Sequence, residues 1–319
     1  MLGISLPLAF FDFVNAPAWA KPFWHIGWGG IAALAVLALL FAMLQLAFPK
    51  IAAIARTTGK EAVLQPLFYI LLGTGILLLW FLAPHLPYFT FGEDVKVVEE
   101  NGLTLVMLLS IILALWTASI SLAEEIEGRT ALTVLCKPIS RRDFVLGKFL
   151  GILGPVAILF IVLGVFFLAS VSYKVFYDAR ETSQPEPNSQ QCLEEVVRIA
   201  PGLVLAFLET TVMVSISVAI STRLGMLPNL VICFSIYVLG HLVPMLAKSA
   251  MGQMPIVTFI ADLLAAILPV LDHFNIYGPI ATGESVPLAY LGLASLYCLA
   301  YSSLAMLAAL LMFEDRDLA

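Results

Sequence analysis

Charged side chains are concentrated in one short stretch of an otherwise apolar chain. The chain has 16 Lys and Arg and 22 Asp and Glu, and nine of these 38 residues lie between Glu124 and Lys148, in EEIEGRTALTVLCKPISRRDFVLGK. Acids at a helix C-terminus and arginines at a helix N-terminus each oppose the helix dipole by roughly 0.3–1 kcal/mol. The two clusters either neutralise each other or meet lipid phosphates, or they bind a soluble partner. The residues alone leave the structural explanation and the partner-binding explanation open.

The same stretch predicts a short helix at the membrane surface. Gly128 weakens the helix before it, and residues 129–136 then make about two turns. Pro138 ends this piece because proline cannot continue the hydrogen-bond ladder. Ser140 is a good N-cap with an acid three residues further on, so a new helix is predicted to begin at Arg141.

No pattern of a catalytic site is present. A phosphate-binding loop needs G-x-x-x-x-G-K-[ST], and the nearest stretch, IARTTGKEA, has Glu61 at the hydroxyl position and Ala53-Ile54 where the first glycine belongs. The sequence contains no H-E-x-x-H or G-x-S-x-G and no paired histidine site. The four cysteines lack metal or redox spacing, so we interpret them as packing residues. An ATP-driven process would need a separate ATP-hydrolysing partner.

One carboxyl group lies inside an apolar run. Glu209, in LVLAFLETTVMVSISVAIS, is about 12 Å of helix rise beyond Pro201. An ionised carboxyl in the bilayer is costly and should face protein or a water-filled cavity. Two roles stay open: contact with a substrate or proton along a pathway, in which Thr210 could share, or a protonated packing role beside Thr210 and Thr211.

These residues must be positioned by membrane helices. The chain is 61% hydrophobic and 12% charged, whereas soluble domains carry about 25% charge. A spanning helix needs about 20 apolar residues, and seven runs qualify: 26–48, 67–86, 102–123, 146–172, 201–221, 227–247 and 287–313. The predicted fold is therefore all-α, a polytopic transmembrane helix bundle. The runs lack the alternation of a barrel, and a net charge of −6 argues against nucleic acid as a partner.

Basic residues on alternate connections predict the orientation. Lys and Arg dominate residues 49–66, 124–148 and 222–226, whereas acids dominate 87–101 and 173–200. Because basic short loops mark the cytoplasmic side, the N-terminus is expected outside and the C-terminus in the cytoplasm.

Three further segments have predicted roles. Residues 1–20 end in an A-x-A-like site, but without a basic n-region we interpret them as an interfacial segment rather than a signal peptide. Residues 173–200 are predicted as an external loop that ends in a short surface helix, QQCLEEVVRIAPG. Residues 255–274 are apolar but interrupted by Asp262 and Pro269, which predicts a re-entrant or interfacial element.

Small residues recur at helical spacing in two runs, which lets helices approach closely. One stripe consists of Gly147, Gly151 and Gly154, and Pro155 beside it predicts a kink. The other consists of Ser295, Cys298, Ser302, Ala305 and Ala309. We interpret both as packing faces, and whether either forms a dimer seam is left open.

The stretch EEIEGRTALTVLCKPISRRDFVLGKFLG closely resembles the cytoplasmic coupling segment of ABC exporter permeases of the type-2 membrane family. That pattern reads roughly E-x-E-x-G-T-x-x-x-L-x-x-P-[IV]-S-R-x-x-[FL]-x-x-G-K. The matching residues are Glu125, Glu127, Gly128, Thr130, Leu135, Lys137, Pro138, Ser140, Arg141, Phe144, Gly147 and Lys148.

Other pieces resemble the family in the same order along the chain. KIAAIARTTGKEAVLQPLFYILL resembles its N-terminal elbow helix and first span, STRLG its turn between the fourth and fifth spans, ILPVLDHFNIYGP its last external segment, and MFEDRDL its C-terminus. The resemblance implies a six-span exporter domain over 49–319. Residues 1–48 add an interfacial segment and one extra span, 26–48, which is either a lateral packing helix or a contact for another subunit.

The resemblance implies a working arrangement. The chain would dimerise with a second permease copy, identical or not, in the lipids of a bacterial cytoplasmic (inner) membrane. An ABC ATPase subunit would carry the ATP and Mg, while this chain would bind no cofactor or metal of its own. Residues 129–137 would form the coupling helix, flanked by Glu125, Glu127 and Arg141. The residues implied in coupling are Glu125, Glu127, Gly128, Arg129, Thr130, Leu132, Leu135, Lys137, Pro138, Ser140, Arg141, Arg142, Phe144 and Lys148.

Two alternatives remain at the level of sequence. A secondary transporter would favour several intramembrane charges and inverted repeats, of which only Glu209 is seen. A membrane scaffold or maturation component would use the same fold, as do related permeases that assist nitrous-oxide reductase maturation or gliding motility. An apolar interior fits lipids, hydrophobic drugs, peptides or polysaccharide carriers alike, so the sequence does not define a substrate.

Overall fold

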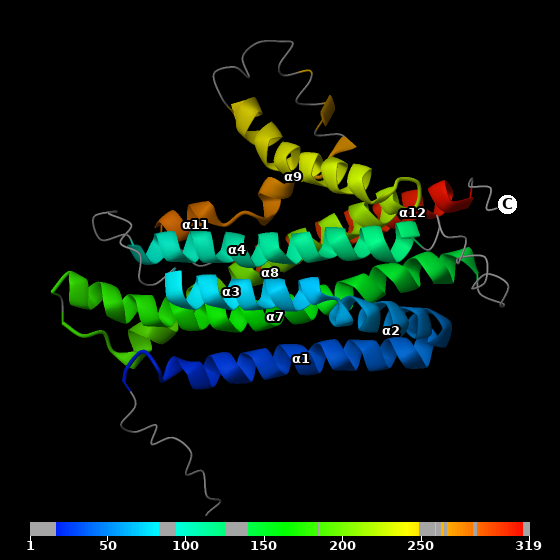
Figure 1. Cartoon of the computed structure of the whole chain (residues 1–319). Coiled ribbons are helices and arrows are strands. Elements are labelled where there is room, and N and C mark those ends of the chain that lie inside the picture. Colours follow the sequence, from blue (N-terminus) through cyan, green and yellow to red (C-terminus); the bar gives the residue numbers. More distant parts are fainter. Residues whose placement is uncertain are drawn as a thin grey trace, which may run out of the picture.

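The computed structural model describes residues 17–82, 94–124, 140–183, 185–248, 259, 263–264, 267–282 and 286–314. Over these residues the regular structure is entirely helical, and most long helices run side by side (Figure 1). Of residues 1–20, for which an interfacial role is predicted, residues 1–16 fall outside the described part of the chain.

The predicted apolar runs coincide with long helices, which confirms the fold class. Six helices are long and apolar enough to cross a membrane, and a bent pair brings the number to as many as seven. The six are α1 (Pro22–Ala47), α4 (Asp94–Ala118, extended by the π-helix η2, Ser119–Glu124), α7 (Arg141–Glu181), α8 (Ser189–Ser221), α9 (Met226–Lys248) and α12 (Leu288–Glu314). The pair is α2 (Pro49–Leu64) and α3 (Pro66–Leu77), with the π-helix η1 (Leu78–Leu82) after α3.

Proline sets the joint between α2 and α3. Gln65 has an extended backbone, with φ −68° and ψ 137°, and Pro66 begins α3. The residue before a proline is sterically driven out of the helical region, so the helix breaks there and the two parts meet at 61°. Buried residues recur along one side of α2 at a spacing of three or four. They are Ile51, Ala52, Ile54, Ala55, Thr58 and Ala62.

Helix α7 begins where the sequence predicts. The Asp143 backbone N–H donates to Ser140 Oγ at 3.1 Å, and the Ser140 N–H donates to Asp143 Oδ2 at 3.4 Å. This capping box starts a helix of 41 residues, about 61 Å long at 1.5 Å per residue. It continues through Pro155 and exceeds the roughly 30 Å of a hydrocarbon core.

The bundle is organised around α7. Helices α1, α2, α4 and α8 all pack against it, and α12 packs against α8. Large side chains fill the centre with under 2% exposure, including Phe144, Phe167, Leu113, Leu159, Leu163 and Leu205. Helix α9 lies against α8 and α4 and diverges from the rest of the bundle along its length (Figure 1).

Residues 173–200 differ from the predicted loop. Helix α7 continues to Glu181 and α8 begins at Ser189, so both helices extend beyond their apolar runs. Buried charge pairs explain the extension. Lys174 Nζ lies 3.5 Å from Asp94 Oδ2 of α4, and Arg198 lies 3.6 Å from Glu99 Oε2 and also contacts Glu195. Polar residues that resemble a loop in sequence are thus paired between helices.

The described part of the predicted 255–274 element lies against α12. It contains the 3-10 helix η4 (Leu271–Phe274), which is followed by the short helix α11 (Tyr277–Thr282); Asp262 lies outside the described residues. Three tyrosines of α12 hold it. Tyr297 Oη accepts from the Val270 N–H at 3.0 Å, while the hydroxyls of Tyr290 and Tyr301 donate to backbone carbonyls of the same segment at 2.6 and 3.2 Å.

The Lys174–Asp94 pair gives a stability prediction. The Lys174 side chain is 0% exposed, and removing one partner of a buried ion pair destabilises a protein by about 3–5 kcal/mol. Lys174→Met should therefore lower the thermal unfolding temperature in detergent, and adding Asp94→Asn should restore part of the loss.

The matched control is an exposed pair at the same end of α7. Arg180 and Glu186 are 3.3 Å apart and 63% and 67% exposed, so Glu186→Gln should change stability by less than about 1 kcal/mol. Equal effects of Lys174→Met and Glu186→Gln would contradict the assignment of a buried tie.

Candidate functional site at the coupling end of the bundle

The two flanks of the predicted coupling segment, η2 and the start of α7, lie at the same end of the bundle. We call this end the coupling end. Helix α4 ends in η2 at Glu124, and α7 begins at Arg141. Residues 125–139, which lie between them, are outside the described residues. They include nine of the residues implied in coupling: Glu125, Glu127, Gly128, Arg129, Thr130, Leu132, Leu135, Lys137 and Pro138.

Lys148 ties the two flanks together. Its side chain is buried, with 3% of the residue exposed. The ammonium donates to the Ser121 carbonyl at 3.2 Å and to Ser121 Oγ at 2.9 Å. It also lies 5.8 Å from the centre of the Phe144 ring. The first two turns of α7 are thereby attached to η2, which joins the last residue of the segment 124–148 to a point three residues before its first.

Asn229 attaches α9 to the same π-helix. It is fully buried, and its Nδ2 lies 2.7 Å from Ser119 Oγ of η2 and 2.9 Å from the hydroxyls of Ser217 and Ser221 on α8. Cys233 Sγ donates to Asn229 Oδ1 at 3.2 Å. An amide NH2 has two hydrogens, so it donates to two of these three hydroxyls at a time. The network joins η2, α8 and α9.

Two arginines hold the C-terminal end of α12. Arg223 Nε donates to the Met312 carbonyl at 2.7 Å. Arg141 lies 3.5 Å from the Phe313 carbonyl, with its guanidinium 5.9 Å from the Phe313 ring. Phe313 stacks on Phe144 at 5.7 Å. Arg141 thus contacts the end of α12, where cations interact favourably with the helix dipole.

The remaining described coupling residues, Ser140 and Arg142, are exposed. Ser140 is used in the cap of α7. Arg142 follows Arg141 in the first turn of α7, where it faces away from the packed interior.

Glycines bring α2 against the first turns of α7. A Cβ on Gly147 would lie 2.7 Å from Ile54 Cβ, and one on Gly151 would lie 2.7 Å from Thr58 Cβ and 2.9 Å from the Ala55 carbonyl. The third member of the stripe, Gly154, has nothing within 4 Å of such a Cβ. The close approach to α2 thus depends on two of the three glycines.

Comparison with protein families identifies the chain. A family model described as ABC-2 family transporter protein matches residues 88–318. The chain belongs to this family. The match starts later than the predicted boundary at residue 49, and it leaves α1, α2 and α3 outside. A comparison with curated proteins gives no match.

Membership makes the chain an integral membrane protein and a permease component of an ABC transporter. Such a component works with an ATPase partner and is generally non-catalytic itself. The contacts at this end of the bundle therefore belong to a transporter subunit.

The intramembrane carboxyl of this ABC-2 permease pairs with a histidine. Glu209 is 2% exposed, and its Oε1 lies 3.4 Å from His241 Nε2 of α9. His241 Nδ1 lies 3.1 Å from the Tyr237 carbonyl; since a carbonyl only accepts, Nδ1 carries a hydrogen. The contact joins a buried carboxyl of α8 to a partly exposed imidazole of α9.

Thr210 and Thr211 do not contact this carboxyl through their hydroxyls. Thr210 Oγ1 donates to the Ala206 carbonyl and Thr211 Oγ1 to the Phe207 carbonyl, both at 2.9 Å. Glu209 lines neither the pocket between α1, α7 and α8 nor the smaller one beside Trp80. The pair bridges α8 and α9.

Several of the residues that join the helices were not identified from the sequence. Ser119, Ser121, Asn229 and His241 each lie in or beside an apolar run. A polar side chain in a membrane helix commonly bonds to a neighbouring helix, and that rule marks Asn229 and His241 as tie points. It does not name their partners.

The glycine contacts give a second prediction. Gly151→Ala places a methyl against α2, and overpacking of this kind costs typically about 1–3 kcal/mol. Gly154→Ala meets open space and should stabilise α7 by up to about 1 kcal/mol. Thermal unfolding of both purified variants checks the pair of outcomes, and a destabilised Gly154→Ala would show that the stripe packs differently.

The contact between Glu209 and His241 gives a third prediction. Glu209→Gln keeps an amide that donates to His241 Nε2, so stability and transport should stay near native. Glu209→Leu leaves His241 without this partner; because the His241 side chain is 29% exposed, stability should fall by less than the cost of a fully buried unsatisfied polar group, about 1–3 kcal/mol. The measurements are thermal unfolding and transport-linked ATPase activity; loss of transport in Glu209→Gln at native stability would assign the carboxyl to the pathway instead.

Proposed function

We propose that this chain is the membrane-spanning subunit of an ABC exporter, and that it binds a separate ATPase subunit through residues 124–148. Two permease copies, identical or not, form the translocation pathway between them. The family match supports the permease role, and the pattern in 124–148 supports the docking site and the direction of transport.

The observation that carries the proposal is the attachment of both flanks of 124–148 to the bundle. On one side, η2 is bonded to Lys148 of α7 and to Asn229 of α9. On the other, the first turn of α7 contacts the end of α12 through Arg141. A displacement of the segment by an ATPase would therefore reach α4, α7, α9 and α12 together, without passing through a flexible link at these flanks.

The π-helix is a suitable point for such a displacement. Its i→i+5 pattern is wider than that of an α-helix, and π-segments occur frequently at functional sites. Lys148 and Asn229 supply the ties to η2 by donating to Ser121 and Ser119. Hydrogen bonds of this kind contribute about 0.5–3 kcal/mol each, so they can be exchanged during a transport cycle.

The chemistry of ATP belongs to the partner in this proposal. The chain carries no phosphate-binding loop in its sequence, so ATP and Mg would be bound by the ATPase subunit and this chain would need no cofactor. Location in the bacterial cytoplasmic membrane, with the C-terminus in the cytoplasm, follows from the same proposal because docking and the positive-inside rule require residues 124–148 to face the cytoplasm.

Copurification tests the proposal. The tagged full-length chain is purified in mild detergent, copurifying proteins are identified, and ATPase activity is assayed. An ATPase subunit should be present with the native chain and lost in the double variant Arg141→Glu with Leu135→Asp. Arg180→Glu is the matched charge control, since Arg180 is exposed at the far end of α7. Absence of any ATPase, by copurification and by crosslinking in intact membranes, would overturn the proposal.

Substitution of Lys148 tests coupling to the ATPase separately from docking of the ATPase. Because it is buried, Lys148→Met should leave the ATPase bound while transport-linked stimulation of its activity falls. Ser121→Ala removes the hydroxyl but keeps the carbonyl acceptor, so its effect should be smaller. Thermal unfolding of both variants controls for misfolding. If both variants fold and still stimulate the ATPase as the native chain does, the contact between Lys148 and Ser121 plays no part in coupling.

A further inference from the structure

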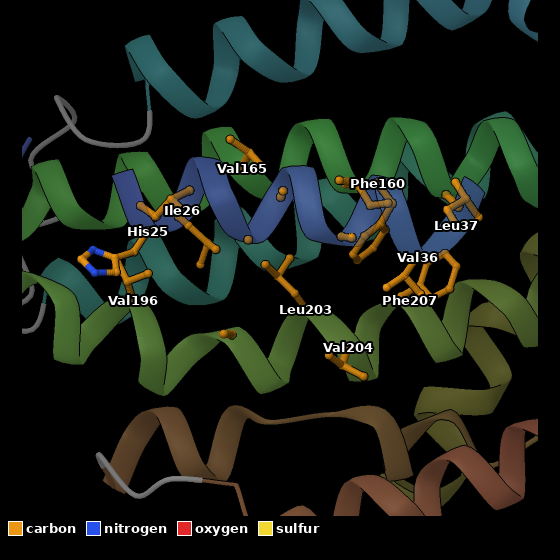
Figure 2. Close-up of a pocket in the computed structure, with 18 of the residues that line it drawn as sticks. His25, Ile26, Val36, Leu37, Phe160, Val165, Val196, Leu203, Val204 and Phe207 are labelled. Carbon is orange, nitrogen blue, oxygen red and sulfur yellow. The ribbon is translucent and has the colours of Figure 1, made fainter. Parts of the chain in front are cut away.

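A groove of about 650 Å³ lies between α1, α7 and α8. Figure 2 shows His25 at one end and Val36, Leu37 and Phe207 towards the other. Among the described residues that line it, His25 alone has a polar side chain. The groove is therefore a site for an apolar chain with one polar end.

The extra helix creates the groove. Helix α1 supplies one wall, from His25 to Leu40, and it lies outside the part of the chain that the ABC-2 family model matches. The 15 residue steps along this wall span about 22 Å, whereas half of a hydrocarbon core is about 15 Å. The groove is long enough to take one acyl chain of a single leaflet.

The groove faces the surroundings of the bundle. Val36, Leu40 and Val197 line it and are 56%, 58% and 61% exposed. In a spanning bundle these side chains meet lipid. The exposed leucines of α12, such as Leu296 and Leu307, are equally apolar, but they line neither described pocket.

The polar end has the features of headgroup depth. Trp24 and Trp28 are 49% and 54% exposed, and their rings pack edge to face at 5.6 Å. Exposed tryptophans gather at membrane interfaces. Lys21 is the N-cap of α1, four residues before His25, so its ammonium lies at the same end of the helix. An ammonium and an imidazole N–H both donate to phosphate oxygens, and bonds with a charged partner are the stronger kind.

We propose that this groove binds a phospholipid, with one acyl chain between α1, α7 and α8 and its phosphate at Lys21 and His25. The lipid completes the packing of α1 against the core at the end of the bundle opposite the coupling segment. This site is independent of ATPase docking, because none of its residues belongs to 124–148.

Photocrosslinking of the full-length chain in nanodiscs tests the site. The probe is a phosphatidylglycerol with a diazirine on one acyl chain, and adducts are mapped by peptide mass spectrometry. Gly29→Phe places an aromatic ring in the groove, because Gly29 lines it and a Cβ there meets nothing within 4 Å. Ile31→Phe is the control, because Ile31 is 57% exposed and lies outside the lining.

Adducts should concentrate on the groove walls in the native chain and in Ile31→Phe, and they should be lost in Gly29→Phe. A diacylglycerol probe with the same chain should label the groove less than phosphatidylglycerol does. That difference should disappear when Lys21 and His25 are both changed to alanine.

Other results overturn the proposal. If the probe labelled the α12 leucines as strongly as the groove, the labelling would reflect general contact with lipid and not a specific site. Labelling that appears only after deletion of residues 2–16 would make the chain's own N-terminus the occupant. Loss of a dimer in Gly29→Phe, but not in Ile31→Phe, would make the groove an interface between two copies.

Discussion

A helix bundle in lipid gains little by burying apolar side chains, because the lipid tails outside are as apolar as the core. Its helices are held instead by close approach and by polar groups that lipid cannot satisfy. Helix α7 illustrates both. Glycines bring α2 within contact of its backbone, Lys148 bonds to η2 at one end, and Lys174 pairs with Asp94 of α4 at the other. These contacts decide the arrangement that the apolar runs alone would leave free.

The two ends of the bundle are held by different chemistry. At the end where α7 finishes, a buried ion pair joins α7 to α4 and a partly buried one joins α8 to α4. Separating such charges in a low-dielectric medium is strongly unfavourable. At the coupling end, the contacts are hydrogen bonds to hydroxyls and to helix-end carbonyls. In the proposed function, a movement that begins at the coupling end exchanges these hydrogen bonds while the ion pairs at the opposite end stay in place.

The sequence predicted the features that depend on neighbours along the chain. The apolar runs, the cap at Ser140 and the closely packed Gly147 and Gly151 are local patterns. The sequence did not predict that residues 173–200 are mostly helical, because the charges there are stabilised by residues about 80 to 100 positions away, in α4. Asn229 meets Ser119, which lies 110 positions earlier, and no spacing within one helix encodes such a pair. Local periodicity identifies a face, whereas the identity of its partner is a property of the tertiary packing.

The attachment of α1 follows the same logic and explains its groove. At its N-terminal end an aromatic cluster of Trp19, Phe23, Trp80 and Tyr173 joins it to the ends of η1 and α7, with ring centres 5.2 to 6.1 Å apart. The Ser172 hydroxyl also donates to the Trp19 carbonyl there at 2.8 Å. At its C-terminal end α1 passes directly into α2. Between these two points α1 approaches α7 at Gly30, where an added Cβ would lie 2.6 Å from Val165, but it offers small residues such as Gly29 and Ala33 towards α8. A helix fixed at both ends and given small side chains on one face cannot close the space beside it, so an apolar groove remains that only lipid or another apolar chain can fill.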